Sequence, residues 1–455
     1  MPQDINIAIK NLKQFGIELN RSMAVMGYRN PPTDENIKTA KENFTRNGFI
    51  QYLQYFDYGD EMHFSEWVDY LVSDKIAKAS DPKPTKEKII AMLWQNWLKT
   101  NRQGYKIEDY WLNEWGNPNQ QKMKPNSTAE AAIQKPKLYV DSLIFYENIA
   151  IEFTAMAANK VRSELGGHIL CGANYGCHPF YYPDLARYVK WFRGNAADLG
   201  RHSEYFWQVG QPGPMCNGYI AEHFRCGMRF NPKAILRQYT MPHSPGNSAA
   251  SFMRTAFTHL AHGAKMLDYF GIGMNECFTE NYIDHRDHER YRLIRDINYC
   301  IGFVEDLLPS SIVMSSKTAI LVSDSTERWD NSGVATEFAG LNQFGASFRK
   351  QRLVYHQERL GLWYALTFLG AAPDLIIEED INEKFLQDYA VLYLVGDCIP
   401  IELAPVIENW IKNGGILFAT SGAGRFGKYK EKNTQLNAIL GISCLLYTSP
   451  SPRDS

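Results

Sequence analysis

Short apolar runs alternate with amphipathic helical stretches along most of the chain. Residues 34–48 (DENIKTAKENFTRNG) predict a helix, because Thr33 can cap its start and the apolar Ile37 and Phe44 fall on one face. The next run, FIQYLQYF at 49–56, is rich in aromatic and β-branched residues and predicts a strand. It leads directly into the polar cluster DYGDEMHF. This order of helix, strand and polar cluster is typical of a β/α unit.

The same succession recurs further along the chain. Strands are expected in GHILCGAN (167–174), SEYFWQVGQ (203–211), KAILRQYTM (233–241) and AKMLDYFGIG (264–273), with an earlier one in IELNRSMAV (17–25). Amphipathic stretches such as 249–262 separate them. Alternating strands and helices with polar residues at the strand ends predict an α/β fold of the (β/α)8 TIM-barrel type. Because eight strands are not visible, the barrel is expected to be incomplete over residues 1–314.

Two further regions depart from the barrel pattern. Residues from about 62 to 145 form a helical, Trp-containing stretch that is too long for an ordinary connection and is expected to be an insertion that shapes a substrate cleft. From residue 315 to 443 the chain predicts a second, doubly wound α/β domain with helices at 346–369 and 401–413. Its expected strands are TAILVSD (318–324), DLIIE (374–378), AVLYLV (390–395) and ILFAT (416–420).

The last residues, 444–455 (CLLYTSPSPRDS), have no hydrophobic period, and Pro and Ser alternate in them. They resemble translated adapter sequence and are expected to be a non-native tail outside the fold.

Composition narrows the class of protein. Hydrophobic residues make up 45% of the chain, charged residues 22%, and the formal net charge is −2, which favours neither nucleic acid nor an acidic membrane as a partner. No run reaches 18 apolar residues and no secretory signal is visible, so a cytoplasmic location is favoured, with the reservation that the N-terminus can be truncated. The eight cysteines form no C-x-x-C pair, so neither a metal site nor a disulfide framework is expected. The glycines Gly422, Gly424 and Gly427 fit a dinucleotide fingerprint, but no apolar helix and no acidic residue follow at the required positions, so no cofactor is expected.

One carboxylate is placed for catalysis. Glu61, in Gly59-Asp60-Glu61, follows the strand at 49–56. Glycosidases use two carboxyl groups that flank the scissile bond, one of them protonated. The rim of a barrel strand would hold such a group rigidly, whereas the alternative is an ordinary solvated loop carboxylate.

Several landmarks occur in the order of a known family. They are Asp60-Glu61, the insertion with Asn117-Pro118, then Asn174, Trp207, and AHGAKMLDYFGIG as the last barrel strand. On these landmarks residues 1–443 resemble a truncated member of glycoside hydrolase family 42, the trimeric β-galactosidase-like enzymes. The resemblance places Glu61 as the general acid/base, although Asp60 stands where the family has Asn.

The second domain carries the more specific part of the resemblance. The stretch AILVSDSTERWD, a long helix, YAVLYLVGD and VIENWIKNGGILFATSGAG follow the order of the family's middle domain over residues 316–443. That domain has an amidotransferase-like, flavodoxin-type fold and mediates trimers. The resemblance therefore implies a homotrimer.

One departure from the family concerns the nucleophile. The nucleophilic Glu of the family ends the seventh strand, but KAILRQYTMPH holds no carboxylate, and Arg237, Tyr239 and Met241 occupy the candidate positions. No Asp or Glu occurs between Glu222 and Asp268. The substitutes are therefore taken from elsewhere: Glu276 first, then Glu204, Glu280 and, as a rarer type of nucleophile, Tyr239 itself.

The sequence thus predicts a glycoside hydrolase that acts on β-galactoside-like bonds, with Glu61 and Glu276 as the catalytic pair. The rival prediction is a carbohydrate-binding barrel that has lost its nucleophile and does no catalysis. In both cases the expected partner is a carbohydrate. The expected substrate contacts are Asp60, His63, Asn174, Tyr175, Trp207, Tyr239 and His243.

Overall fold

The computed structural model describes residues 13–16, 33–46, 48, 50, 53–59, 64–116, 123–175, 185–200, 213–243, 247–269, 287–332 and 354–442. Contacts divide the chain into two compact units: Met1–Pro125 with Asp141–Ser315, and Asn126–Val140 with Ser316–Ser455. The strands expected at 17–25 and 203–211 and the tail lie outside the described residues.

The first unit contains a parallel sheet of short strands between helices. The strands are β1 (Tyr55–Asp57), β2 (Leu170–Gly172), β3 (Leu199–Gly200), β4 (Ile235–Tyr239) and β5 (Ala264–Asp268). The helices are α2 (Asp34–Arg46), α3 (Phe64–Ala77), α4 (Lys86–Asn101), most of α6 (Pro136–Leu165), α7 (Ala186–Arg193), α8 (Gly213–Met228), α9 (Ala249–Ala261) and α10 (His288–Gly302). Four of the expected strands and both expected helices are confirmed, but the strands are shorter than their apolar runs.

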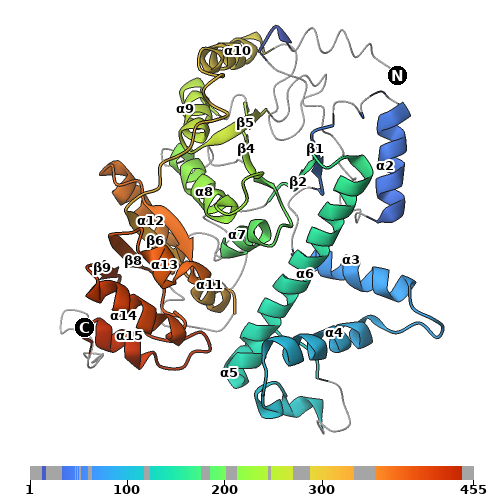
Figure 1. Ribbon diagram of the computed structural model, residues 1–455, viewed down its shortest axis with the longest axis vertical. Coiled ribbons are helices and arrows are strands. Elements are labelled where there is room, and N and C mark those ends of the chain that lie inside the picture. Colours follow the sequence, from blue (N-terminus) through green and yellow to red (C-terminus); the bar gives the residue numbers. More distant parts are fainter. Residues whose placement is uncertain are drawn as a thin grey trace, which may run out of the picture. The chain divides into compact units, whose positions relative to one another are not determined.

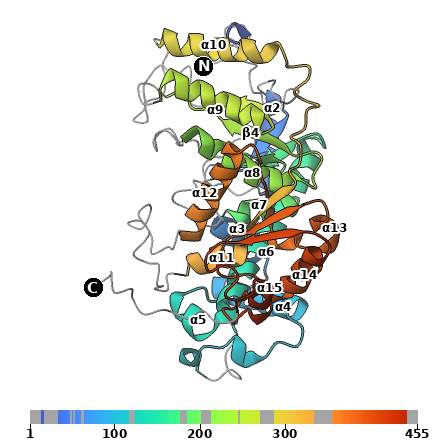
Figure 2. The ribbon, with the colours of Figure 1, turned by 90° about the vertical axis from the view of Figure 1, so that its left-hand side faces the viewer.

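The five strands pair in chain order, β1-β2-β3-β4-β5, and every pair is parallel. This order is that of successive β/α units in a barrel wall. Helices α7, α8, α9 and α10 pack in the same sequence, each against the next, as Figures 1 and 2 show. The first unit is therefore α/β with a parallel, barrel-type sheet covered by helices on one side.

Local capping explains where several helices begin. Thr33 accepts a hydrogen bond from the backbone N–H of Asn36 at the start of α2, as the sequence predicts. Ser248 does the same for Ser251 at α9, and Thr85 for Lys88 at α4. Each cap satisfies an N–H that the first helical turn leaves without an acceptor.

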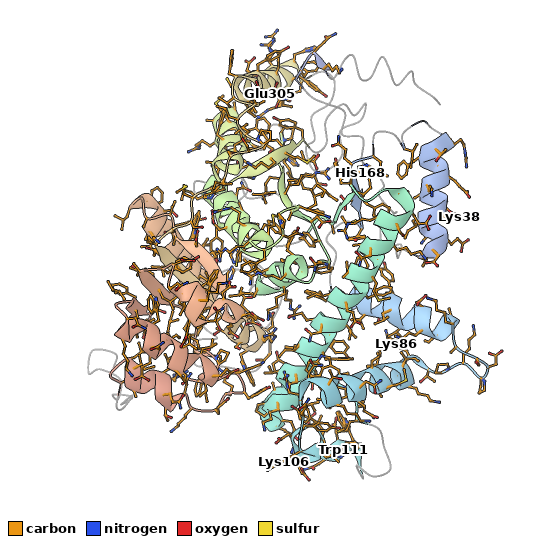
Figure 3. The ribbon with its side chains drawn as sticks, viewed as in Figure 1. Lys38, Lys86, Lys106, Trp111, His168 and Glu305 are labelled. Atoms are coloured by element: carbon orange, nitrogen blue, oxygen red, sulfur yellow. The ribbon has the colours of Figure 1, made fainter. Side chains whose placement is uncertain are left out.

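The insertion between β1 and β2 has an aromatic core of its own. Trp94 and Trp97 of α4 stack at 5.5 Å, and both rings contact Phe145 of α6. Arg102 and Tyr110 donate hydrogen bonds to the fully buried Asp141. Two 3₁₀ turns, Ile107–Asp109 and Asn113–Trp115, complete the insertion near Lys106 and Trp111, which Figure 3 labels. Its described tryptophan rings are buried, so they stabilise the insertion rather than form open platforms for sugars.

The second unit is built on a four-stranded parallel sheet. Its strands are β6 (Thr318–Val322), β7 (Asp374–Ile377), β8 (Val391–Leu394) and β9 (Ile416–Ala419), in the order β7-β6-β8-β9. Its helices are α5 (Ala129–Gln134), the first five residues of α6, α11 (Asp324–Asp330), α12 (Val354–Phe368), α13 (Glu383–Leu386), α14 (Ala404–Lys412) and α15 (Thr434–Ile439). All four strands expected from the sequence are confirmed.

Alternate residues of this sheet face two helical layers. Ala319 and Leu321 pack with Ile407 and Trp410 of α14, whereas α12 contacts β6 as well. The early segment 126–140 belongs to this unit because the Tyr139 hydroxyl donates to the carbonyl of Arg328 at 2.6 Å and its ring contacts Trp329. Among the described helices, none has the length and apolar character needed to cross a bilayer.

Candidate active site

The candidate site lies at the edge of the first sheet where the parallel strands end. Alternation separates two faces of these strands. Leu267 and Tyr269 belong to the cluster around Phe252 of α9, so they face the helices. Asp268, between them in sequence, faces the opposite side, which is the interior of the barrel wall.

Three charged side chains meet on the interior side. Arg237 of β4 places Nη2 2.5 Å from Oδ2 of Asp268 at the end of β5, and Nη1 4.0 Å from Oδ2 of Asp57 at the end of β1. The guanidinium also lies 4.2 Å from the centre of the Tyr55 ring. Arg237 is buried, so the contacts with the two carboxylates and the aromatic face replace part of the hydration of its guanidinium.

The two carboxylates differ in access. The side chain of Asp268 is 15% exposed and that of Asp57 is 5% exposed. Asp57 is also held from its own strand, because Oδ1 accepts the backbone N–H of Gly59 at 3.3 Å. Asp268 is therefore the carboxylate of this group that a ligand can reach more readily.

The segment after β4 is fixed by hydrogen bonds close to Asp268. The N–H of Thr240 donates to the carbonyl of Asp268, and the Thr240 hydroxyl lies 3.2 Å from Nδ1 of His259 on α9. The side-chain amide of Asn247 donates a hydrogen bond to the carbonyl of Met241, and its backbone N–H donates one to the carbonyl of His243. These bonds hold the backbone of the loop that carries His243.

The structure places four of the expected substrate contacts. The backbone N–H of Asn174 donates to the carbonyl of Gly59, so Asn174 lies beside the end of β1. Tyr239 is directly opposite Asp268 in the strand register, and His243 is fully buried in the loop that follows. Asn174, Tyr239 and His243 therefore come from the ends of β2 and β4, where the sequence predicts them.

Tyr175 differs from its expected role. Its ring is fully buried, and its neighbours are the rings of Tyr188, Trp191, Phe192 and Phe224 on α7 and α8. Burial raises the pKa of the Tyr175 hydroxyl well above its usual value. Since the strand alternates, a residue next to Asn174 points to the helices, and we leave Tyr175 out of the substrate contacts.

The other expected residues lie outside the described residues. This applies to both members of the expected catalytic pair, Glu61 and Glu276, to the weaker candidates Glu204 and Glu280, and to Asp60, His63 and Trp207. The described part of the chain contains no group of three or more His, Cys, Asp or Glu side chains that could hold a metal ion.

Two other buried carboxylates of this unit are committed to packing. Burial alone would raise the pKa of Glu222 on α8, but hydrogen bonds from His262 and Arg225 outweigh burial and lower it.

Asp198 precedes β3, at the edge of the sheet where the strands begin, and accepts hydrogen bonds from Arg162 and Asn231. His168, labelled in Figure 3, likewise precedes β2 and contacts the carbonyl of Leu53 before β1. Residues at this opposite edge of a barrel support stability rather than chemistry.

Asp57 and Asp268 are the site residues that sequence reasoning missed. Each ends a strand, in YFD and in AKMLD, so position alone could have indicated them. The sequence does not indicate them further, because it does not show that Arg237, on a third strand, contacts both Asp57 and Asp268.

Comparison with known proteins adds the fold. No protein-family model matches the chain, and no curated protein matches its sequence. A cold-adapted β-galactosidase from Rahnella sp. R3 superposes with a TM-score of 0.58 at 15% identity, over 90% of this chain and 57% of its own. The chain has the fold of glycoside hydrolase family 42 β-galactosidases.

Two further solved structures share this fold. A β-galactosidase from the haloarchaeon Halorubrum lacusprofundi has a TM-score of 0.55 at 14% identity, over 90% of this chain and 60% of its own. An exo-carrageenase of the same family from Bacteroides ovatus has a TM-score of 0.53 at 10% identity, over 96% of this chain and 61% of its own. This chain therefore spans about three fifths of the length of the enzymes it resembles.

Proposed function

We propose that this chain carries the barrel of a glycoside hydrolase that cleaves β-galactoside-like bonds, with Glu61 as the general acid/base. The observation that supports the proposal is the family 42 fold across nine tenths of the chain, together with acidic residues where strands of the barrel-type sheet end. In barrel enzymes that edge is where catalytic residues lie. Glu61 follows Gly59 by two residues in the sequence, just after β1.

The surroundings of the sugar form part of the proposal. Asn174, Tyr239 and His243, from the ends of β2 and β4, are proposed to contact the substrate with Asp60, His63 and Trp207. Glu276 stays a candidate for the second carboxylate.

We also propose that residues 1–314 form an incomplete barrel and residues 315–443 an amidotransferase-like domain that mediates a homotrimer in the whole protein. The β7-β6-β8-β9 order supports that domain type, since flavodoxin-like sheets begin with the same order.

The test is a panel of aryl β-glycosides and β-linked disaccharides, assayed with the wild-type chain, Glu61→Gln and Glu276→Gln. Glu42→Gln, an exposed change on α2, is the matched control. Loss of a general acid should lower kcat/KM by about 10²–10⁴-fold on disaccharides, and by less on nitrophenyl glycosides, whose leaving group needs little protonation. If Glu61→Gln lowers the rate on both kinds of substrate no more than Glu42→Gln does, Glu61 is not the acid.

A second candidate function is carbohydrate binding without hydrolysis. The observation that favours it is β4, whose interior side presents Arg237 and Tyr239 and no carboxylate. Titration calorimetry with galactose-containing oligosaccharides distinguishes the two. Binding with no turnover of any substrate in the panel would support the second function and contradict the first.

A further inference from the structure

We propose that Asp268 is the catalytic nucleophile of the hydrolase, so that the second carboxylate has moved from β4 to the neighbouring strand β5. This inference rests on the proposed function. Asp268 was not among the catalytic residues that the sequence predicts.

The first argument is position. Asp268 is the last residue of β5 and pairs in register with Tyr239, the last residue of β4. Two adjacent parallel strands end side by side, so a carboxylate on either of them can reach the same space beyond the sheet. A register shift between Leu236 and Arg237 gives β5 an extra residue at this point and sets the pairing of Tyr239 with Asp268.

The second argument is what stands on β4. Arg237 occupies the interior side of β4 and directs its guanidinium at Asp268, 2.5 Å away. A cation there cannot act as a nucleophile, but it fixes the carboxylate that can. The backbone of Asp268 is also held in place, because its carbonyl accepts a hydrogen bond from the N–H of Thr240. A carboxylate that an arginine contacts, on a backbone that is itself fixed, has the rigid aim that attack on one carbon atom requires.

The third argument is the contrast with Asp57. Asp57 faces the same guanidinium at the longer distance of 4.0 Å, is less exposed, and accepts a hydrogen bond from Gly59. It is therefore a positioning residue that keeps Arg237 in place. Asp268 combines an ion pair with partial exposure, which is what a carboxylate needs to meet substrate.

The reaction then balances in two steps. An Asp268 carboxylate oxygen forms a bond to the anomeric carbon while the bond from that carbon to the leaving oxygen breaks, and the proposed acid Glu61 gives its proton to that oxygen. Water next attacks the same carbon from the opposite face. Glu61 takes the proton from water, and the ester bond to Asp268 breaks, which restores both carboxyl groups and retains the β configuration.

The test uses the full chain and the aryl β-glycoside that the wild type cleaves fastest. Asp268→Ala should lower kcat by about 10³-fold or more, since removal of a nucleophile abolishes the covalent route. Sodium azide should restore turnover and give the α-glycosyl azide, because it attacks from the face that Asp268 used. Glu61→Ala with azide should give the β-glycosyl azide instead. Asp296→Ala, an exposed carboxylate on α10, is the matched control and should keep wild-type turnover.

A second measurement does not depend on whether the variant folds. A 2-deoxy-2-fluoro aryl glycoside should inactivate the wild-type chain, and fragmentation of the labelled peptide in a mass spectrometer should place the sugar on Asp268. A label on Glu276, azide rescue of Glu276→Ala but not of Asp268→Ala, or a product of inverted configuration would each overturn the role of Asp268 and leave the hydrolase proposal standing. A wild-type chain that cleaves no glycoside would overturn both proposals.

Discussion

The ion pair between Arg237 and Asp268 makes a quantitative prediction about Arg237→Met. Methionine keeps much of the apolar stem but removes the charge that Asp268 and Asp57 both face. At an effective dielectric constant of about 20, the attraction is about 7 kcal/mol at the shorter distance and about 4 kcal/mol at the longer one. Much of this is offset because burial of each ion costs several kcal/mol.

The net loss follows from what the variant leaves behind. Removal of one partner of a buried pair costs about 3–5 kcal/mol, because the other charge stays desolvated. The partial exposure of Asp268 places the expected loss near the lower end, about 3 kcal/mol. Arg237→Met combined with Asp268→Asn should cost less than the sum of the single changes, by about 2 kcal/mol.

Hydrogen exchange with mass spectrometry suits this chain, because it reads the stability of β4 and β5 without requiring the two units to unfold together. A loss of about 3 kcal/mol should reduce the protection of their amides by about two orders of magnitude. Arg295→Met is the control, since its pair with Asp296 is exposed and should contribute below about 1 kcal/mol. The claim that this pair fixes the site would be refuted if the stability losses of Arg237→Met and Asp268→Asn were additive. It would also be refuted if the amides of β4 and β5 were equally protected in Arg237→Met and Arg295→Met.

Three other predictions follow from the described residues. Burial raises the pKa of Glu378 well above its usual range, so the folded state keeps a proton that the unfolded state releases above about pH 4.3. The stability of the second unit should therefore fall as the pH rises from there. Glu378→Gln should flatten that fall, which thermal melts at pH 5 and pH 8 would measure. Burial also raises the pKa of the Cys171 thiol to about 12, so iodoacetamide at pH 8 should label the exposed Cys300 and spare Cys171 in the folded chain, and equal labelling would contradict the packing. A Cβ on Gly172 would lie 2.6 Å from the carbonyl oxygen of Leu199, so Gly172→Ala should destabilise by about 1–3 kcal/mol in urea unfolding, whereas Gly167→Ala, which has open space, should not.

The sequence by itself determined most of the element types and their order, although β3 lies in none of the predicted runs. Apolar runs such as TAILV and amphipathic stretches such as the one capped by Ser248 predict strands and helices because their periods match the pleat and the helical turn. The confirmed strands are shorter than their predicted runs, and all but β1 lie wholly within them. β1 has three residues, of which Tyr55 and Phe56 end the eight-residue run and Asp57 follows it, which shows how little periodicity says about strand ends.

Side-chain roles at strand ends were less accessible from sequence. Asn174 and Tyr175 are neighbours that can both hydrogen-bond a sugar, yet Tyr175 packs among the rings of α7 and α8, because alternate residues of a strand face opposite layers. The pattern predicted that both lie near the site, but the choice between them depends on which face each residue takes.

The partner of Arg237 was decided by tertiary structure alone. The sequence shows Arg237, Tyr239 and Met241 at the positions where the resemblance allows a carboxylate, and the next acid in the chain after Arg237, Asp268, is 31 positions away. What joins them is the parallel pairing of β4 with β5, which closes that separation to a contact of 2.5 Å. Local periodicity carries no information about such a contact, because it arises from the order in which strands pair and the register that they adopt.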